Sequence, residues 1–347
     1  MRRLVSALLL AAFMASSAAA GTTYVRAGRL LDVETGKVRT GQCITIITER
    51  ITQVAQCGPA PKGATVVDWR KYTVLPGLID LHTHLADVGQ GADIAEPIKT
   101  GPAETAFIGA KNARDTLRAG FTTVRDVGTF RVFSDVKLRD AIDRGLIPGP
   151  RMAVVGTYLT IPGGGGEING LPPGTVPDEM RFGVVRTPEE ARAKAEALFK
   201  GGADFLKLIA TGAVLAIGTE PGQPELTEAE MRAAVEVAKA HGSYATAHAH
   251  GAEGIKAAIR AGVRSIEHAS LIDEEGSRSP RPRASGSSWM SIMATGSTKS
   301  APRKAGPPNI CARTARRHRS SATCSGKVSK WAPRSPSGPT AASIRMA

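Results

Sequence analysis

Residues 77–271 alternate between short apolar runs typical of buried strands and longer segments with helical periodicity. Thr187 stands before Pro188 at the start of one helical segment, and Thr227 precedes Glu230 by three residues at the start of another, as in a capping box. The strand-like runs, in chain order, are "GLIDLHTH", "FTTVRDVG", "PRMAVVG", "DFLKLIATG", "SYATAHAH" and "VRSIEHAS". Strands separated by crossover helices form parallel sheets, so this alternation predicts a parallel α/β fold.

Polar or titratable residues stand near the carboxyl end of each strand-like run. Parallel barrels build their active sites at that end of their strands. The pattern therefore favours a (β/α)8 TIM-like barrel over a doubly wound sheet. Only about six of the eight units are present, so we expect residues 76–276 to form an incomplete barrel.

The segment before the barrel has a different rhythm. Residues 21–75 contain short strand-like runs separated by turns, which predicts a small β domain, either a single sheet or a sandwich-like pair. Cys43 and Cys57 lie in this segment and could pair in an oxidising compartment, although their spacing does not require it.

The first twenty residues predict export. Arg2 and Arg3 form a positive start, Leu4–Met14 is a short apolar core, and small alanines precede Gly21. We therefore expect residues 1–20 to be a signal peptide and the mature protein to be periplasmic or secreted. No later run is long and apolar enough to cross a membrane, so no membrane span is expected.

The net charge of +14 is confined to one segment. Residues 277–347 hold 14 Lys and Arg and no Asp or Glu, whereas residues 1–276 hold 31 basic and 31 acidic residues. The body is thus neutral, and the basic segment lacks interleaved aromatic residues, so no nucleic-acid partner is expected. Its composition, rich in Ser, Arg, Pro, Ala and Gly, fits either a disordered tail or an out-of-frame translation, and we favour the second.

Four histidines and one lysine stand where the predicted barrel would place its site. His82 and His84 are two apart on one strand and so point to the same side. His248 and His268 end the fifth and sixth strands, and Lys207 lies within the apolar "FLKLIA" of the fourth. A buried lysine is costly unless it is neutralised, paired or modified. The set therefore predicts a metal site more readily than ordinary packing.

The ordered set "GLIDLHTH", "FLKL", "AHAHG" and "SIEHAS" resembles the metal-dependent amidohydrolase superfamily, in its imidazolonepropionase-like and Xaa-Pro dipeptidase-like branch, over residues 22–276. The resemblance implies that His82 and His84 hold one divalent metal ion and that His248 and His268 hold a second. It also implies that Lys207 carries a CO2-derived carbamate that bridges the two ions, for which zinc is the expected element.

The implied reaction is hydrolysis of an amide or peptide-like C–N bond in a small molecule or dipeptide, by a hydroxide shared between the two ions.

His250 is expected near the substrate or behind the ligands. Asp126 closes the second strand and is either a supporting residue of the site or a structural one. Gly165 lies in a glycine-rich loop where the family often has a substrate-contacting histidine. Glycines there indicate either a loop whose backbone approaches a ligand or only flexibility. Glu267 alternates with His268 and is interpreted as an outer-face residue. A homo-oligomer is left open.

One departure from the family is decisive for activity. The family needs an aspartate at the end of the eighth strand, and no Asp or Glu follows Glu275 in this sequence. We therefore expect this 347-residue chain to be inactive or nearly so. The alternative is a non-catalytic periplasmic protein that binds a metal or another ligand.

Overall fold

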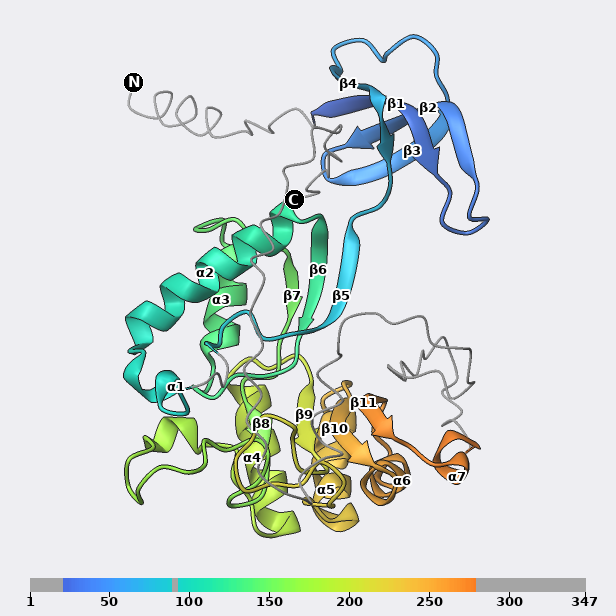
Figure 1. The fold of residues 1–347 in the computed structure, drawn as a ribbon. Coiled ribbons are helices and arrows are strands. Elements are labelled where there is room, and N and C mark those ends of the chain that lie inside the picture. Colours follow the sequence, from blue (N-terminus) through green and yellow to red (C-terminus); the bar gives the residue numbers. More distant parts are fainter. Residues whose placement is uncertain (1–20, 89–92, 279–347) are drawn as a thin grey trace, which may run out of the picture.

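A computed structural model describes residues 21–88 and 93–278 (Figure 1). The predicted signal peptide, residues 1–20, and nearly all of the basic segment, residues 277–347, lie outside the described residues. Within the described ranges, no helix is long and apolar enough to cross a membrane.

The N-terminal strands form one mixed sheet. Their order is β3-β2-β1-β4, with β1, β2 and β3 antiparallel and β4 parallel to β1. The strands are β1 (Thr22–Leu31), β2 (Val38–Ile47), β3 (Arg50–Gln56) and β4 (Thr65–Val74). One face buries a small apolar cluster that includes Val25, Ile44 and Val74. Among the described residues these four strands pair into a single sheet and not into the two packed sheets of a sandwich.

A disulfide joins Cys43 in β2 to Cys57, which follows β3 directly. The backbone N–H of Cys57 also donates to the carbonyl of Gly41 at 2.8 Å. The bridge closes a short loop around the β2–β3 hairpin. It therefore constrains the edge of a sheet whose buried cluster is small.

Removing this bridge should weaken the N-terminal sheet. For a closed loop of about 15 residues, the chain-entropy model gives about 3 kcal/mol of stabilisation. We expect the double variant Cys43→Ser, Cys57→Ser to lose a free energy of unfolding of that order, measured by urea denaturation. Reduced wild-type protein is the control and should behave like the variant. An unchanged transition in both samples would contradict the prediction.

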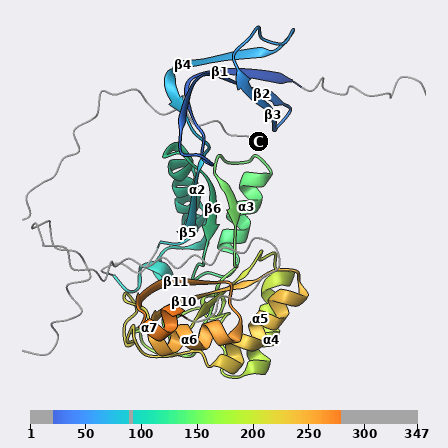
Figure 2. The ribbon, with the colours of Figure 1, turned by 90° about the vertical axis from the view of Figure 1, so that its right-hand side faces the viewer.

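The barrel region contains all six predicted strand–helix units, and its strand pairs are all parallel. Its strands are β5 (Leu78–Thr83), β6 (Phe121–Asp126), β7 (Arg151–Ala153), β8 (Tyr158–Leu159), β9 (Leu206–Ile209), β10 (Ala245–Gly251) and β11 (Ser265–Leu271). Its helices are α1 (Glu96–Lys99), α2 (Pro102–Arg118), α3 (Ser134–Asp143), the short η1 (Asp178–Met180), α4 (Pro188–Lys200), α5 (Glu228–Ala240), α6 (Ala252–Ala261) and α7 (Glu274–Arg278). Figure 2 shows the same elements from the side.

The sheet is split at the predicted third strand. The predicted strand, residues 150–156, forms only β7, which pairs with β6. The separate short strand β8 follows it and pairs with β9, which gives the sheets β5-β6-β7 and β8-β9-β10-β11. Helices α2 and α3 lie beside the first sheet, and α4, α5 and α6 lie beside the second (Figure 1). The barrel is not closed among the described residues, because β5 and β11 are the end strands of their sheets.

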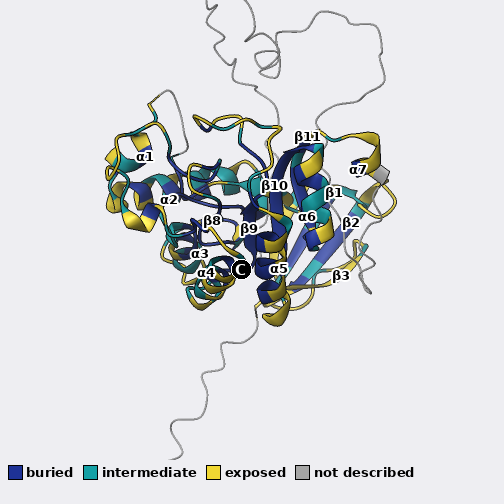
Figure 3. Ribbon diagram, turned by 90° about the horizontal axis from the view of Figure 1, so that it is seen from below, coloured by how far each residue is buried: buried dark blue, intermediate teal, exposed yellow. Residues whose placement is uncertain are grey.

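The main apolar core lies between β9, β10 and the helices α4, α5 and α6. Both strands are buried along their whole length (Figure 3). The helices begin as the sequence predicts: Thr187 Oγ1 accepts from the Glu190 N–H, and Thr227 and Glu230 form the reciprocal capping box. This half of the barrel therefore provides the rigid support for the residues at its strand ends.

Two aspartates accept hydrogen bonds from backbone N–H groups in the segment where strand pairing is interrupted after β7. The N–H groups of Val155 and Gly156 donate to Asp135 Oδ2 at 3.0 and 2.9 Å, and the N–H of Val154 donates to Asp204 Oδ2 at 2.9 Å. Buried N–H groups without partners are costly, so the break persists because these carboxylates replace the missing ladder bonds. Asp135 is fully buried in the first turn of α3.

Replacing Asp135 should destabilise the fold more than replacing a surface aspartate of the same helix. Asp135→Ala leaves the N–H groups of Val155 and Gly156 unpaired in the interior, at a cost of about 1–3 kcal/mol for each buried group. Asp140→Ala is the matched control, because the Asp140 side chain is 42% exposed and its change should stay within about 0.5 kcal/mol. Equal unfolding free energies for the two variants would refute this role of Asp135.

Candidate metal centre

Five histidines meet at the carboxyl ends of the strands. The ring centroids of His82 and His268 are 4.9 Å apart, and those of His248 and His268 are 4.5 Å apart. His84 lies 5.3 Å from His82, and His250 lies 4.8 Å from both His248 and His268. The candidate ligand atoms of His248, His250 and His268 all lie within 4.8 Å of one another. Strands β5, β10 and β11 thus bring distant parts of the sequence into one cluster.

Four of the rings have one nitrogen engaged by the protein. His84 Nδ1 lies 2.8 Å from the Gly128 carbonyl, and His250 Nδ1 lies 2.9 Å from Ser270 Oγ. His82 Nδ1 lies 2.9 Å from Glu267 Oε2, and His248 Nε2 lies 3.3 Å from the Gly212 carbonyl. Histidine ligands in metalloproteins are oriented by such contacts on the nitrogen that does not bind the ion. The arrangement therefore leaves one nitrogen of each of these rings available.

Lys207 lies on β9 with only 1% of its surface exposed. It pairs in register with Thr246 of β10 and with Tyr158 of β8. Burial lowers the pKa of its ammonium group to about 7, against the opposing attraction of Glu267. A lysine in this state is partly a neutral amine at neutral pH.

The histidines are neutral in this environment. Burial, together with the nearby positive charge of Lys207, lowers the pKa of His84 to about 4 and that of His268 to about 3. The same two causes lower the pKa of His248, His250 and His82. In His82 alone, a hydrogen bond to Glu267 acts to raise the pKa. Neutral imidazole is the form that binds metal ions, so at neutral pH the rings are in the protonation state that metal binding requires.

Glu267 was expected on the outer face, and this expectation is wrong. Its side chain is buried and contacts His82, Arg125 and Thr246 in the barrel interior. Strand alternation fails here because His268 has φ +75° and Ala269 has φ +48°, so β11 departs from extended geometry directly after Glu267. Glu267 and His268, although adjacent in sequence, thus both reach the same cluster.

Asp126 supports the segment that carries His84. Its Oδ2 accepts from Thr83 Oγ1 at 3.2 Å and from the Leu85 N–H at 2.5 Å, and both donors flank His84 in sequence. Burial, followed by the repulsion of Asp135, raises the pKa of Asp126 well above its ordinary value. Asp126 therefore fixes the side chain of Thr83 and the backbone of Leu85 on either side of His84.

The glycine-rich loop packs tightly against the protein. The Gly165 N–H donates to Glu225 Oε2 at 2.9 Å, and a Cβ at Gly165 would stand 2.9 Å from Ala213. Glycine at this position is therefore required for close packing, whereas its predicted proximity to a ligand stays a prediction. Tyr158, which the sequence pattern did not single out, places its hydroxyl 3.2 Å from His84 Nδ1. Its position directly after the predicted third strand, residues 150–156, was the signal that could have identified it.

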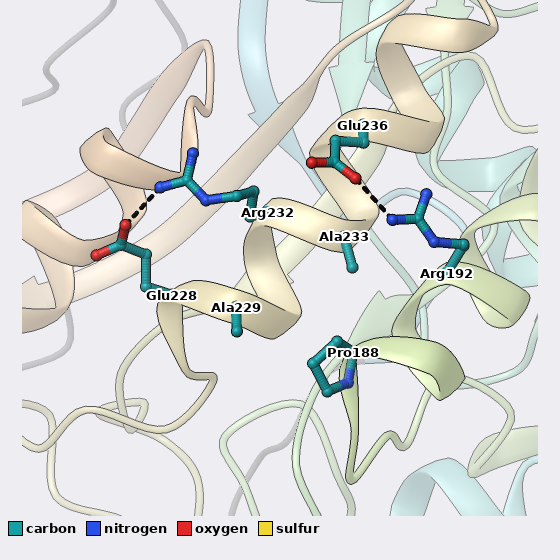
Figure 4. A pocket seen from close by; sticks show the side chains of 7 residues that line it. All are labelled: Pro188, Arg192, Glu228, Ala229, Arg232, Ala233 and Glu236. Carbon is teal, nitrogen blue, oxygen red and sulfur yellow. Dashed lines mark hydrogen bonds and ion pairs between the residues drawn. The ribbon is translucent and has the colours of Figure 1, made fainter.

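A groove of about 420 Å³ lies elsewhere, between the outer faces of α4 and α5 (Figure 4). Arg192 and Arg232 line it, and each is already paired with a glutamate of the groove, Glu236 and Glu228 respectively. None of its lining residues belongs to the histidine cluster. We therefore assign the candidate chemistry to the strand ends and not to this groove.

Comparison with known families agrees with the residue pattern. The sequence profile of the Amidohydrolase family matches residues 73–321, which includes every histidine of the cluster and Lys207. The chain belongs to the amidohydrolase family. The resemblance inferred from the order of the histidines and the lysine is thereby confirmed.

Individual proteins similar to this chain carry the names of enzymes. Ochratoxinase from Aspergillus niger is 29% identical over 279 residues, which cover 76% of this chain and 57% of the relative. A Xaa-Pro dipeptidase with bound methionine is similar in structure, with a TM-score of 0.67, 35% identity and coverage of 74% of this chain and 63% of the other. A prolidase complexed with N-methylphosphonate-L-proline has a TM-score of 0.66 and 30% identity, with coverage of 74% and 62%. The chain thus spans about three fifths of the length of these relatives.

Two histidines of β10 compete for one ligand role in this amidohydrolase, and the sequence favours His248. His248 lies two residues closer than His250 to Thr246, the register partner of Lys207. We expect His248→Ala to weaken zinc binding at least tenfold, because one of its nitrogens would face the centre. His250→Ala should change zinc affinity little. Zinc titration of both purified variants decides between them, and the reverse order would assign the ligand to His250.

Proposed function

We propose that this amidohydrolase is a metal-dependent hydrolase of amide or peptide-like C–N bonds, of the dipeptidase or amidase type, that acts at the histidine cluster. The observation that carries the proposal is the convergence of neutral imidazoles and a buried lysine at the carboxyl ends of parallel strands. The names of the similar proteins, a Xaa-Pro dipeptidase, a prolidase and ochratoxinase, support a small substrate with such a bond.

The donor set fits two divalent ions. His82 and His84 would hold one ion, His248 and His268 the other, and zinc suits imidazole ligands. When bound, such ions lower the pKa of water and polarise a carbonyl group. The protein's own contribution is to hold the rings neutral and oriented, through contacts with Gly128, Ser270 and other acceptors. His250 would then face the substrate.

Lys207 would contribute as a carbamate. With a pKa of about 7, the lysine is partly a neutral amine, whose nitrogen can form a bond to the carbon of CO2 and release one proton. The product carries anionic oxygens in place of a buried ammonium. This exchange would remove a positive charge that repels metal ions, and it would offer them anionic oxygen ligands.

Lys207 should therefore be the site of CO2 uptake. We expect 13C-labelled bicarbonate to give a carbamate signal in the zinc-loaded protein by NMR, because the buried amine is partly neutral. The signal should vanish in Lys207→Ala, whose zinc affinity should fall at least tenfold. Lys200→Ala, at the exposed end of α4, is the matched control and should keep both properties. A carbamate signal that persists in Lys207→Ala would overturn the assignment.

The 347-residue chain itself is proposed to lack turnover. No Asp or Glu follows Glu275 in these 347 residues, so they offer no aspartate side chain from an eighth strand to accept and pass on a proton. We further propose that residues 277–347 are translated out of frame. If so, the intact reading frame encodes the remaining βα units and the catalytic aspartate.

Sequencing the encoding DNA across codons 270–350, and expressing any restored frame, tests the function directly. The restored chain should hydrolyse Xaa-Pro dipeptides or N-acyl amino acids in the presence of zinc, and a His84→Asn variant of it should not. Absence of hydrolysis by a folded, zinc-loaded restored chain would count against the hydrolase. If no frame restores the missing units, the alternative of a non-catalytic metal- or ligand-binding protein becomes the better description.

Export is proposed on two grounds. Residues 1–20 have the pattern of a signal peptide, and the Cys43–Cys57 disulfide fits an oxidising compartment such as the periplasm or the exterior.

A further inference from the structure

Glu267 is the centre of a buried polar network that crosses the barrel interior. Its Oε1 accepts from Arg125 and from Thr246 Oγ1, the latter at 2.6 Å. Its Oε2 lies 2.9 Å from His82 Nδ1. Arg125 is itself fixed, because its Nε donates to the Leu81 carbonyl at 2.7 Å and its Nη1 donates to Ser265 Oγ at 3.1 Å. The two oxygens of Glu267 therefore have different and well-defined partners.

The network determines which nitrogen of His82 carries the proton. Glu267 forms a buried ion pair with the guanidinium of Arg125, which is permanently charged, so this carboxylate is ionised. An ionised carboxylate only accepts hydrogen bonds. A neutral His82 that contacts it must donate from Nδ1, and Nε2 is then the nitrogen with a free electron pair.

We propose that Glu267 is the positioning residue that holds His82 as the Nδ1–H tautomer and so presents Nε2 to the metal centre. The inference rests on the proposed function, because it gives Nε2 a ligand role. It also explains why the buried carboxylate of Glu267 contacts His82. Glu267 lies on β11 and His82 lies on β5, so the two residues are far apart in sequence. Carboxylate partners of ligand histidines fix the tautomer and the ring orientation in this way.

Glu267→Gln is a directional test because the surroundings dictate how the amide must lie. Arg125 is only a donor, so the carbonyl oxygen of the introduced glutamine has to face Arg125 and Thr246. The amide NH2 then faces His82 and donates to Nδ1, which forces the Nε2–H tautomer. That tautomer has no free electron pair on the nitrogen that faces the centre.

The first readout uses metal-free protein. Two-dimensional 1H–15N NMR of the imidazole nitrogens should show Nδ1–H for His82 in the wild type and Nε2–H in Glu267→Gln, with the His82 signals assigned by their loss in His82→Asn. The wild-type spectrum alone tests the proposal, even if the Glu267→Gln variant does not fold. An Nε2–H tautomer in the wild type would overturn it.

The second readout is metal affinity, measured by Co2+ titration with its visible absorption. Glu267→Gln should bind Co2+ about 10- to 100-fold more weakly than the wild type. Thr246→Val is the matched control, because it removes a donor to Oε1 and leaves the contact of Oε2 with His82 intact. Its tautomer and its affinity should both stay close to those of the wild type.

The outcomes separate the two proposals. A wild-type protein that binds no Co2+ would refute the proposed metal-dependent function, whatever the tautomer of His82. A wild type that binds Co2+ normally, and a folded Glu267→Gln with the same affinity and tautomer, would refute the role of Glu267 alone. Equal losses of affinity in Thr246→Val and Glu267→Gln would also refute it, because they would indicate a general structural effect.

Discussion

The buried ion pair between Arg125 and Glu267 joins the two parts of the split parallel sheet. Arg125 belongs to β6 and Glu267 to β11, and these strands lie in different sheets. Breaking a buried pair by removing one partner costs about 3–5 kcal/mol, because the remaining charge is left without compensation. The pair also determines where His82 can lie, since the same carboxylate contacts its ring. Stability of the open barrel and order at the histidine cluster are thus linked through one side chain.

The positive charge of Lys207 has two opposed effects on metal binding at the cluster, and the proposed carbamate would remove the unfavourable one. The positive charge of Lys207 opposes protonation of the surrounding histidines, which keeps them in the form that binds metal ions. The same charge would repel a divalent cation. A lysine whose pKa is lowered to about 7 is partly a neutral amine, which is the form that would react with CO2 to give the proposed carbamate. The burial of β9 therefore favours the neutral amine as well as the neutral rings, and the negative charge of the proposed carbamate would be offset by the metal ions.

Much of the candidate site could be predicted from the sequence, because it follows from regular geometry. Strand periodicity and the ends of parallel strands sufficed to group His82, His248 and Lys207. His268 was grouped with them by its place near the end of its strand and not by periodicity. Glu267 was missed because the left-handed backbone at His268 and Ala269 interrupts the alternation on which its assignment to the outer face depended. Such a local departure depends on tertiary packing and leaves no trace in periodicity.

The fold shows the same division between regular and irregular features. The six strand–helix units were predictable from caps and apolar runs, but the break in the third strand was not. That break depends on Asp135, whose position in the first turn of α3 looks like an ordinary helix start in the sequence. Only its contacts with Val155 and Gly156 show that it replaces missing strand pairing.

The split of the sheet also divides the proposed ligand set. His82 and His84 come from the sheet of β5, whereas Lys207, His248 and His268 come from the sheet of β9, β10 and β11. A pair of ions bridged by Lys207 would therefore act as a cross-link between two structural halves. Its binding free energy would add to their cohesion, so that loading with metal and assembly of the barrel become one cooperative transition.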